Sequence, residues 1–383
     1  MAADVLDRTH IVRNETTMHD RPTIDPSTLR PAIPGLRLRT WRGDADATAI
    51  AELENRAWAA DSLAYRTSPE LVRHELRTLP GFDLERDLLL AEAEGRLVGL
   101  ARHHRQVEGD GTPVHALSGV VDPAVRRRGL GRLLLGHNLE RARVVAATAE
   151  PSGLRPPVAS VWLADTEVGG IALVEGAGFR PVRWFFEMVR PNLDDLPSVE
   201  LPAGLELRPA TPATARRIIE ADAEAFRDHW GHTELTEEEV RSVLDDPETD
   251  LALWQVAWDG NEVAGAVIVL VRESENRCLG RRRGWLDSVG VRRPWRRRGL
   301  ATALMVRAME TLRARGLEEA VLGVDADNPS GALGLYERLG FRRTMRFAVY
   351  RRPLDEGERA AGIPSEASTS PRTTAPLAGR PTR

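Results

Sequence analysis

The sequence predicts a mixed α/β fold built from two copies of one unit, arranged in tandem. The chain has 383 residues, more than the roughly 100–200 residues of an ordinary single domain. Two arginine-rich segments, "VRRRGLGRL" at 125–133 and "VRRPWRRRGLATA" at 291–303, resemble each other, and their glycines Gly129 and Gly299 lie 170 residues apart. In each copy an antiparallel run of strands precedes strands that alternate with helices, which favours a mixed sheet over a doubly wound one.

The second copy gives the clearer pattern. Between 213 and 226, Ala215, Ile219, Ala223 and Phe226 recur at helical spacing and should face inward. The predicted elements, in order, are a strand at 205–208, a helix at 213–226, a helix opened by a capping box of Thr236 and Glu239, a hairpin at 251–271, a polar loop, a strand at 285–291, a helix at 300–315, a strand at 320–324, a helix within 328–341 and a strand at 346–352.

The first copy repeats this order of elements. It has a strand at 36–39, a hairpin at 88–104, a strand at 116–121, a helix at 129–143 and a final turn and strand at 178–190. Polar, proline-containing segments without periodicity surround the two copies. The predicted organisation is a disordered tail at 1–34, a first domain at 35–190, a linker at 191–203, a second domain at 204–353 and a disordered tail at 354–383.

Composition excludes several classes of chemistry. All 53 basic residues are arginine, so no phosphate-loop lysine, no lysine Schiff base and no serine/lysine dyad is available. Cys278 is the only cysteine, which rules out an intrachain disulfide and is compatible with a reducing compartment. We find no apolar run long enough to cross a bilayer and no secretory leader, so a cytoplasmic protein without a membrane partner is expected.

The two arginine-rich segments have the form of an anion-binding turn. A strand that runs through "RxxGxA" into a helix leaves N–H groups unpaired at the helix start. In the second copy Gly299, Leu300 and Ala301 would bring this backbone close to a bulky anion, with positive charge from the run Arg296, Arg297 and Arg298. The first copy keeps the pattern in Val121, Arg126, Gly129 and Gly131.

This turn, together with the downstream "DADNPSGALGLYERLGF" at 325–341, resembles the GNAT superfamily of acyl-CoA N-acetyltransferases. The resemblance covers about 36–190 and 204–352, and it is more specific in the second copy. It implies acetyl-CoA as co-substrate and a fourth strand that separates from the fifth. The backbone of Val289, Gly290 and Val291 would then pair with the pantetheine arm. Asn328 would bond that arm in relatives, or only cap the following helix.

The resemblance also suggests an acid and a base in the second copy. An alkylammonium has a pKa of about 10.4 and must lose a proton before it attacks. Asp287 is the candidate base, because strand alternation would put it on the same face as Val291; the alternative is a surface or salt-bridged acid. Tyr336 is the candidate acid for the leaving thiolate, a transfer uphill by about 2 kcal/mol; the alternative is packing beside Leu335.

The first copy lacks these chemical groups. Alignment on the "GF" pairs puts Val174 opposite Tyr336 and Thr166 opposite Asn328, and alignment on the turns puts Leu117 opposite Asp287. We therefore expect a first domain that holds acyl-CoA, or only the fold, without catalysing transfer. His115 is a weak candidate for a substitute base.

The acceptor should bind beside the first helices of the second copy, where His229, Trp230 and His232 stand out; a zinc site there lacks a third ligand, so no metal is expected. The main prediction is an acetyl-CoA-dependent N-acetyltransferase that acts on a small-molecule or protein amine through a ternary complex. A non-catalytic acyl-CoA-binding regulator is the alternative. Nucleic-acid binding is disfavoured by the net charge of -4. The oligomeric state stays open.

Overall fold

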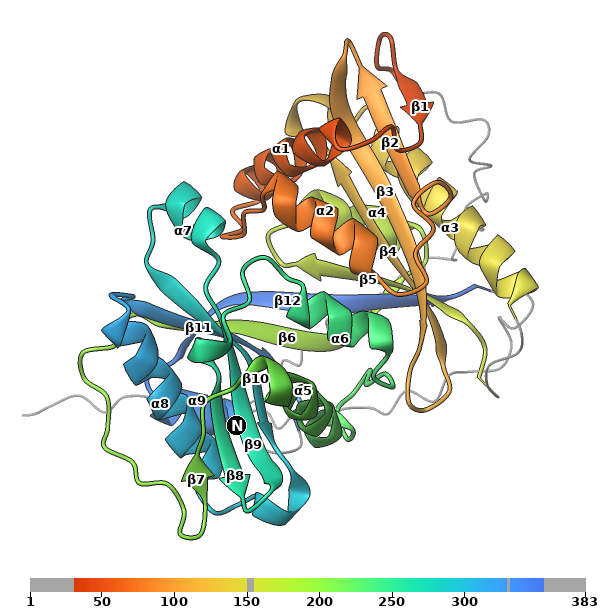
Figure 1. Cartoon of the computed structure of the whole chain (residues 1–383). Helices are drawn as coiled ribbons and strands as arrows, with labels where there is room; N and C mark the ends of the chain where they lie inside the picture. Colours follow the sequence, from red (N-terminus) through yellow and green to blue (C-terminus); the bar gives the residue numbers. More distant parts are fainter. Residues whose placement is uncertain (1–30, 150–154, 329–330, 355–383) are drawn as a thin grey trace, which may run out of the picture.

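The computed structural model describes residues 31–149, 155–328 and 331–354, and within them the strands form one continuous mixed sheet. The predicted tails lie outside the described residues, apart from 31–34 and Leu354. The strand order is β1-β2-β3-β4-β5-β12-β6-β11-β10-β9-β8-β7. Figure 1 shows β12 and β6 crossing the centre, between the first half of the chain and the second. The mixed α/β fold with two tandem units is confirmed.

In the first half, strands and helices follow the predicted order. They are β1 (Arg37–Arg39), α1 (Ala45–Ala60), α2 (Pro69–Thr78), β2 (Leu88–Ala93), β3 (Arg96–Val107), β4 (Pro113–Val121), α3 (Leu130–Thr148), β5 (Val158–Ala164), α4 (Val168–Gly176) and β6 (Arg180–Arg190). Before α3, Pro123–Val125 form a single turn of 3-10 helix.

The second half repeats the order with one extra helix. Its elements are β7 (Glu206–Leu207), α5 (Pro212–Phe226), α6 (Glu237–Leu244), β8 (Gln255–Asp259), β9 (Glu262–Leu270), α7 (Glu273–Leu279), β10 (Arg283–Val291), α8 (Leu300–Ala314), β11 (Glu319–Asp325), α9 (Ala332–Arg338) and β12 (Arg342–Pro353). Short 3-10 turns at Leu251–Leu253 and Arg293–Trp295 precede β8 and α8.

The last strands of the two units are exchanged. β12 ends the second unit, yet it pairs with β5 of the first, where Val349 lies opposite Trp162. β6 ends the first unit, yet it pairs with β11 of the second, where Met188 lies opposite Leu322. Because each unit completes the sheet of the other, the segment predicted as a linker at 191–203 joins two halves that share backbone hydrogen bonds.

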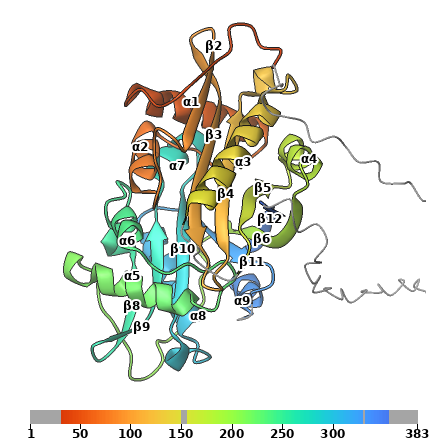
Figure 2. The same cartoon turned by 90° about the vertical axis from the view of Figure 1, so that its right-hand side faces the viewer.

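Helices cover both faces of the sheet. α1, α2, α5 and α6 lie on one face, and α3, α4, α8 and α9 lie on the other (Figure 2). The core beneath α8 is fully buried at Leu304, Met305 and Met309, and a second core lies between α5 and β9 around Ile218 and Ile268. Burial of such side chains, each stabilising by about 1.5–3 kcal/mol, fixes the position of the β10 backbone from both sides.

The structure corrects the sequence prediction in several details. The expected polar loop after β9 contains a helix, α7. Helix α5 buries Ile218 and Ala225 more completely than the predicted Ala223 and Phe226. The predicted capping box of α6 is confirmed: the Thr236 hydroxyl accepts from the Glu239 N–H. Part of the predicted N-terminal tail is packed, as Ile33 lies in a core cluster.

Candidate active site

The second arginine-rich turn is open at its glycine. Gly299 is the N-cap of α8, with a left-handed φ of 85°, and Arg297 two residues earlier is also left-handed, at 62°. A β-carbon built at Gly299 would meet no described atom within 4 Å. Helix α8 therefore presents its first N–H groups, at the positive end of the helix dipole, to a space that a large anion can enter.

The first turn has the same backbone, but the chain itself lies over it. Gly129 has a φ of 93°, and a β-carbon there would lie 3.5 Å from the Pro31 backbone. The Ala32 N–H donates to the Arg128 carbonyl at 3.0 Å. Ile33 then enters the core with Leu130. The two turns thus share a conformation and differ in access.

The first arginine of each turn is used within the fold. Arg296 donates from Nε to the Val291 carbonyl at 2.9 Å and from Nη2 to the Ala225 carbonyl at 2.7 Å. Arg126 donates to the Val121 carbonyl at 3.2 Å and pairs with Asp61 at 2.6 Å. These arginines hold the turn against its strand. The charge that remains exposed at the second turn belongs to Arg297 and Arg298, which face solvent.

The strand before the second turn separates from its neighbour. β10 and β11 pair in parallel only as far as Trp285 opposite Val321. Beyond that point β11 stays hydrogen-bonded to β6, while β10 continues to Val291 bonded to β9 on its other edge alone. The free edge of β10 includes the predicted backbone residues Val289, Gly290 and Val291. It can accept an extended amide chain as an added strand.

A β-bulge at Asp287 marks the start of this separation. Leu286 pairs with Val269 and Ser288 pairs with Ile268, so Asp287 is the extra residue of β10. The bulge interrupts strand alternation. The prediction that Asp287 and Val291 share a face is therefore wrong: Val291 packs against the α8 core, whereas Asp287 lies among charged groups.

The Asp287 side chain is exposed to solvent at the surface of the fold. The protein packed near it raises the pKa of Asp287, an effect that Arg272 opposes and Asp246 reinforces. Its side chain makes no hydrogen bond or ion pair to the residues that the structure describes. A carboxylate in this state can accept a proton.

The bulge also corrects the alignment of the two copies. The last parallel pairs are Ala116 with Ser160 in the first half and Trp285 with Val321 in the second. Leu117 therefore corresponds to Leu286, not to Asp287. The pairing of β4 shows no register shift, so Asp287 has no counterpart in the first half.

Tyr336 lies on α9 in the core beneath α8. It is 7% exposed, and burial raises the pKa of Tyr336 to about 12. Proton transfer from this phenol to a free thiolate, whose conjugate acid has a pKa of about 8.5, would be uphill by about 5 kcal/mol rather than the 2 kcal/mol expected from the sequence. Transfer while the C–S bond is breaking reduces this cost.

The comparison of Tyr336 with Val174 is supported by backbone geometry. The Phe341 N–H donates to the Tyr336 carbonyl at 3.0 Å, and the Phe179 N–H donates to the Val174 carbonyl at 3.1 Å. Val174 is 3% exposed and packs in the first-half core. The first half thus has an apolar side chain where the second half has a phenol.

Asn328 does not cap α9, because Gly331 is the N-cap residue of that helix. Asn328 instead belongs to the turn after β11, where its N–H donates to the Asp325 carbonyl at 3.2 Å. The prediction of a capping role is wrong. A role toward the pantetheine arm stays a prediction.

Sequence reasoning missed Asp222. This residue lies on the sheet-facing side of α5, and the Ser288 hydroxyl donates to its carboxylate at 2.7 Å. A β-carbon at Gly290 would overlap Asp222 Oδ1. Burial, reinforced by the charge of Asp287 and opposed by Ser288, raises the pKa of Asp222 to about 7. The available signal was weak, because one aspartate on an amphipathic helix has no recognisable motif.

The three predicted acceptor residues are not grouped together. Trp230 lies over the central strands, with its ring 4.3 Å from the Arg351 guanidinium and 6.3 Å from the Phe185 ring. His229 contacts the Phe226 ring at 4.5 Å, and burial lowers the pKa of His229. The His232 N–H donates to the His229 carbonyl at 3.2 Å, in the turn that follows α5.

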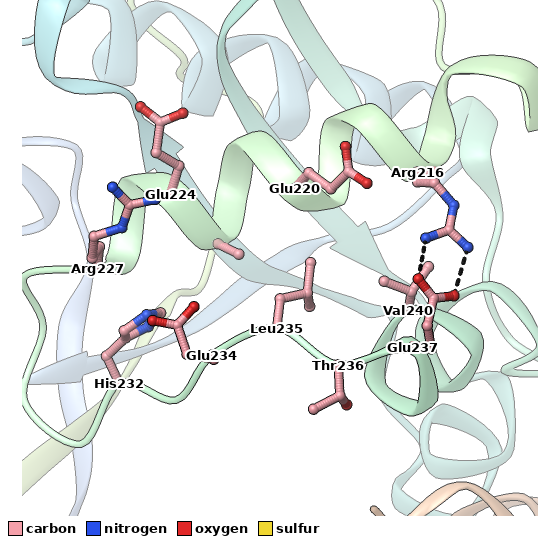
Figure 3. A pocket seen from close by; sticks show the side chains of 11 residues that line it. Arg216, Glu220, Glu224, Arg227, His232, Glu234, Leu235, Thr236, Glu237 and Val240 are labelled. Atoms are coloured by element: carbon pink, nitrogen blue, oxygen red, sulfur yellow. Dashed lines mark hydrogen bonds and ion pairs between the residues drawn. The ribbon is translucent and has the colours of Figure 1, made fainter. Parts of the chain in front are cut away.

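His232 borders a pocket of about 270 Å³ beside α5. Figure 3 shows Arg216 paired with Glu237 at one end of this pocket, and Glu234 beside His232 at the other. Residues of α5 that line this pocket face away from β10, so the pocket and the Asp222 carboxylate lie on opposite sides of the helix.

His115 is part of a buried network. Its Nδ1 lies 2.9 Å from Nε2 of His103, whose Nδ1 is 3.1 Å from Asp87. Arg141 donates to the same carboxylate at 2.7 Å. His115 Nε2 has no partner among the described residues. Burial lowers the pKa of His115 to about 4, and this enclosed position does not suit a substitute base.

Among the residues that the structure describes, no group of three or more His, Cys, Asp or Glu could hold a metal ion. In the same part of the chain, no helix combines the length and the apolar character that a membrane span requires.

Family and sequence comparisons agree on one class of protein. Residues 48–149 and 215–341 match the model described as the acetyltransferase (GNAT) family. A mycothiol acetyltransferase of Clavibacter michiganensis subsp. michiganensis is 32% identical over 318 residues, covering 79% of this chain and 90% of that protein. A mycothiol acetyltransferase of Geodermatophilus obscurus is 30% identical over 315 residues, covering 80% and 94%.

Solved structures show the same architecture. A GCN5-related N-acetyltransferase from Sphaerobacter thermophilus superposes with a TM-score of 0.63 at 28% identity, covering 85% of this chain and 97% of that one. A tandem GNAT protein from the clavulanic acid biosynthesis pathway gives a TM-score of 0.61 at 19% identity, covering 84% and 99%. The second likeness concerns the fold alone.

Proposed function

The chain belongs to the GNAT family of acetyltransferases, and from this premise we propose that its second half transfers the acetyl group of acetyl-CoA to a small amine by direct attack. The observation that carries the proposal is the open turn at Gly299 beside the free edge of β10. An extended ligand with an anionic end fits both features at once.

In this proposal the diphosphate of acetyl-CoA binds the N–H groups at the start of α8, near Arg297 and Arg298. A helix dipole alone contributes about 0.3–1 kcal/mol, so the several N–H donors and the two guanidinium groups must supply most of the binding. The pantetheine arm pairs with Val289 to Val291. An N–H of this free edge can face the thioester oxygen and stabilise the charge that develops there.

The reaction requires a carboxylate close to the thioester and a proton for sulfur. Asp287, which the sequence predicts as the base, brings one carboxylate to the bulge at the start of the free edge. Tyr336 donates its phenolic proton as the thiolate leaves. The phenol is protonated at neutral pH, and burial raises its pKa further.

The first half has a structural role in this scheme. Pro31 lies over its turn, Val174 replaces the tyrosine, and β4 has no residue that corresponds to Asp287. Its β6 also completes the sheet beside β11. We therefore expect one acetyl-CoA site per chain.

For the acceptor we propose the unacetylated amine form of mycothiol. The support is the name of the relatives at 32% and 30% identity, which match most of their own length. Trp230 offers an aromatic surface next to the centre of the sheet for a polar small molecule.

The test is release of CoA when the purified chain is mixed with acetyl-CoA and this amine, followed with a thiol reagent. Release of CoA that depends on the amine, and that is slower in Tyr336→Phe than in the wild type, would support the proposal. Tight acetyl-CoA binding with no release for this amine or for a panel of other primary amines would contradict it. That result would favour the acyl-CoA-binding regulator instead.

A further inference from the structure

The site contains a second carboxylate, on a different element from Asp287. Asp222 belongs to α5, one of the helices that cover β10, and its side chain points at the strand. Both of its oxygens lie 2.7 Å from Ser288 Oγ. Ser288 follows Asp287 directly in β10, and Asp287 is the charged neighbour that acts on Asp222.

Gly290 is what allows this carboxylate to approach the strand. Any β-carbon at position 290 would overlap Asp222 Oδ1 and would lie 3.4 Å from the β-carbon of Ala225. The carboxylate thus occupies the space of a missing side chain, directly against the β10 segment with the free edge.

The charges around Asp222 favour a bound proton. Asp287 is the charged neighbour that acts on it most, and the Ser288 hydroxyl is its hydrogen-bond donor. Arg272 and Asp246 act on Asp287 from the side of α6 and α7. Asp222 is only partly exposed, and its pKa of about 7 lets it bind or release a proton near neutral pH, as a general base should.

We propose that Asp222, acting through the Ser288 hydroxyl, accepts the proton that the acceptor ammonium must lose. The proposal rests on the proposed function. Ser288 Oγ takes a proton from the ammonium while its own proton passes to Asp222, so the hydroxyl ends unchanged and the nitrogen gains a lone pair.

The remaining steps balance. The amine nitrogen forms the C–N bond with the thioester carbon, and the C–S bond breaks with its electron pair on sulfur. Tyr336 gives its proton to that sulfur, and the second proton shed by the nitrogen restores the phenol through water. Asp222 then releases its proton to solvent, so one proton leaves for each acetyl group transferred.

The experiment compares Asp222→Asn, Ser288→Ala and the control Glu220→Gln, which removes an acid from the outer face of the same helix. Acetyl-CoA affinity is measured by calorimetry, and kcat/KM is measured from pH 5.5 to 9 with acetyl-CoA and the unacetylated amine of mycothiol. Unchanged acetyl-CoA affinity in each variant shows that the fold and the second turn are intact.

We expect Asp222→Asn to lower kcat/KM about 100-fold at pH 7 and to remove the inflection near pH 7 from the profile, because the titrating group is gone. Ser288→Ala should lose about tenfold, while Glu220→Gln should match the wild type. If Asp222→Asn keeps the turnover of the wild type and the inflection near pH 7, the role of Asp222 is overturned and the proposed function is not affected. A wild type that binds acetyl-CoA without turnover would overturn the proposed function itself.

Discussion

Asp222 should make the protein less stable as the pH rises, and its replacement by Asn should remove that dependence. Folding raises the pKa of this carboxyl from 3.8 to about 7. A group of this kind stabilises the fold fully below its unfolded pKa, and the contribution is lost as the pH rises through the folded value. At alkaline pH the protein must hold a charged carboxylate in a partly buried place.

The size of the effect follows from the two values. At pH 5 nearly all folded molecules hold the proton and nearly all unfolded molecules have lost it, whereas at pH 8 both states are mostly ionised. At 1.36 kcal/mol per unit, this group alone lowers the free energy of unfolding by about 2–3 kcal/mol between pH 5 and pH 8. Asn cannot titrate, and its carbonyl can still accept from Ser288.

The assay is urea unfolding at pH 5 and pH 8 for the wild type, Asp222→Asn and Glu220→Gln. The pH 5 to pH 8 loss should be about 2–3 kcal/mol smaller in Asp222→Asn than in the wild type, and Glu220→Gln should follow the wild type. Equal losses in all three proteins would refute the raised pKa. If Asp222→Asn is more stable than the wild type at pH 8, the result would indicate that the protein keeps this acid for its activity although the acid lowers its stability.

Three further predictions concern other parts of the site and its support. In steady-state kinetics, Tyr336→Phe should lower kcat about 100-fold, while calorimetry should show a change in acetyl-CoA affinity of less than twofold. An unchanged kcat would remove the phenol from the mechanism. Replacing both Arg297 and Arg298 with alanine should weaken acetyl-CoA binding about tenfold by calorimetry, whereas replacing Arg127 and Arg128 should leave the affinity unchanged. The wild type should bind one acetyl-CoA per chain. A second binding site, or equal losses of affinity in the two double variants, would contradict the covered first turn. Folding lowers the pKa of His115 to about 4, so the free energy of unfolding should fall by about 2 kcal/mol as the pH falls from 7 to 5. In urea unfolding, His115→Leu should show a smaller loss over this range. A loss equal to that of the wild type would exclude His115 as its source.

The parts of the fold that follow from local pattern could be predicted from the sequence. The turns at Gly129 and Gly299 were recognisable because a strand end, a glycine and an apolar helix come in direct succession. The helices begin directly after these glycines, as predicted, and both glycines are left-handed. The loss of the phenol at Val174 was also visible, because the following Phe anchors both copies in the same way.

Features that depend on distant contacts could not be predicted. The exchange of β6 and β12 leaves no local mark, because a buried strand has the same pattern in either sheet position. The bulge at Asp287 adds one residue without a sequence signal and shifts every alignment upstream of it. Asp222 gains its importance from Ser288 and Gly290, which are 66 and 68 positions away in the sequence.

The most direct test of the central claim is a crystal structure of the chain with acetyl-CoA. The diphosphate should lie on the N–H groups at the start of α8, beside Gly299, with the pantetheine arm along β10 and the thioester between Asp222 and Tyr336. Acetyl-CoA bound at the Gly129 turn alone, or bound at neither turn, would contradict the account.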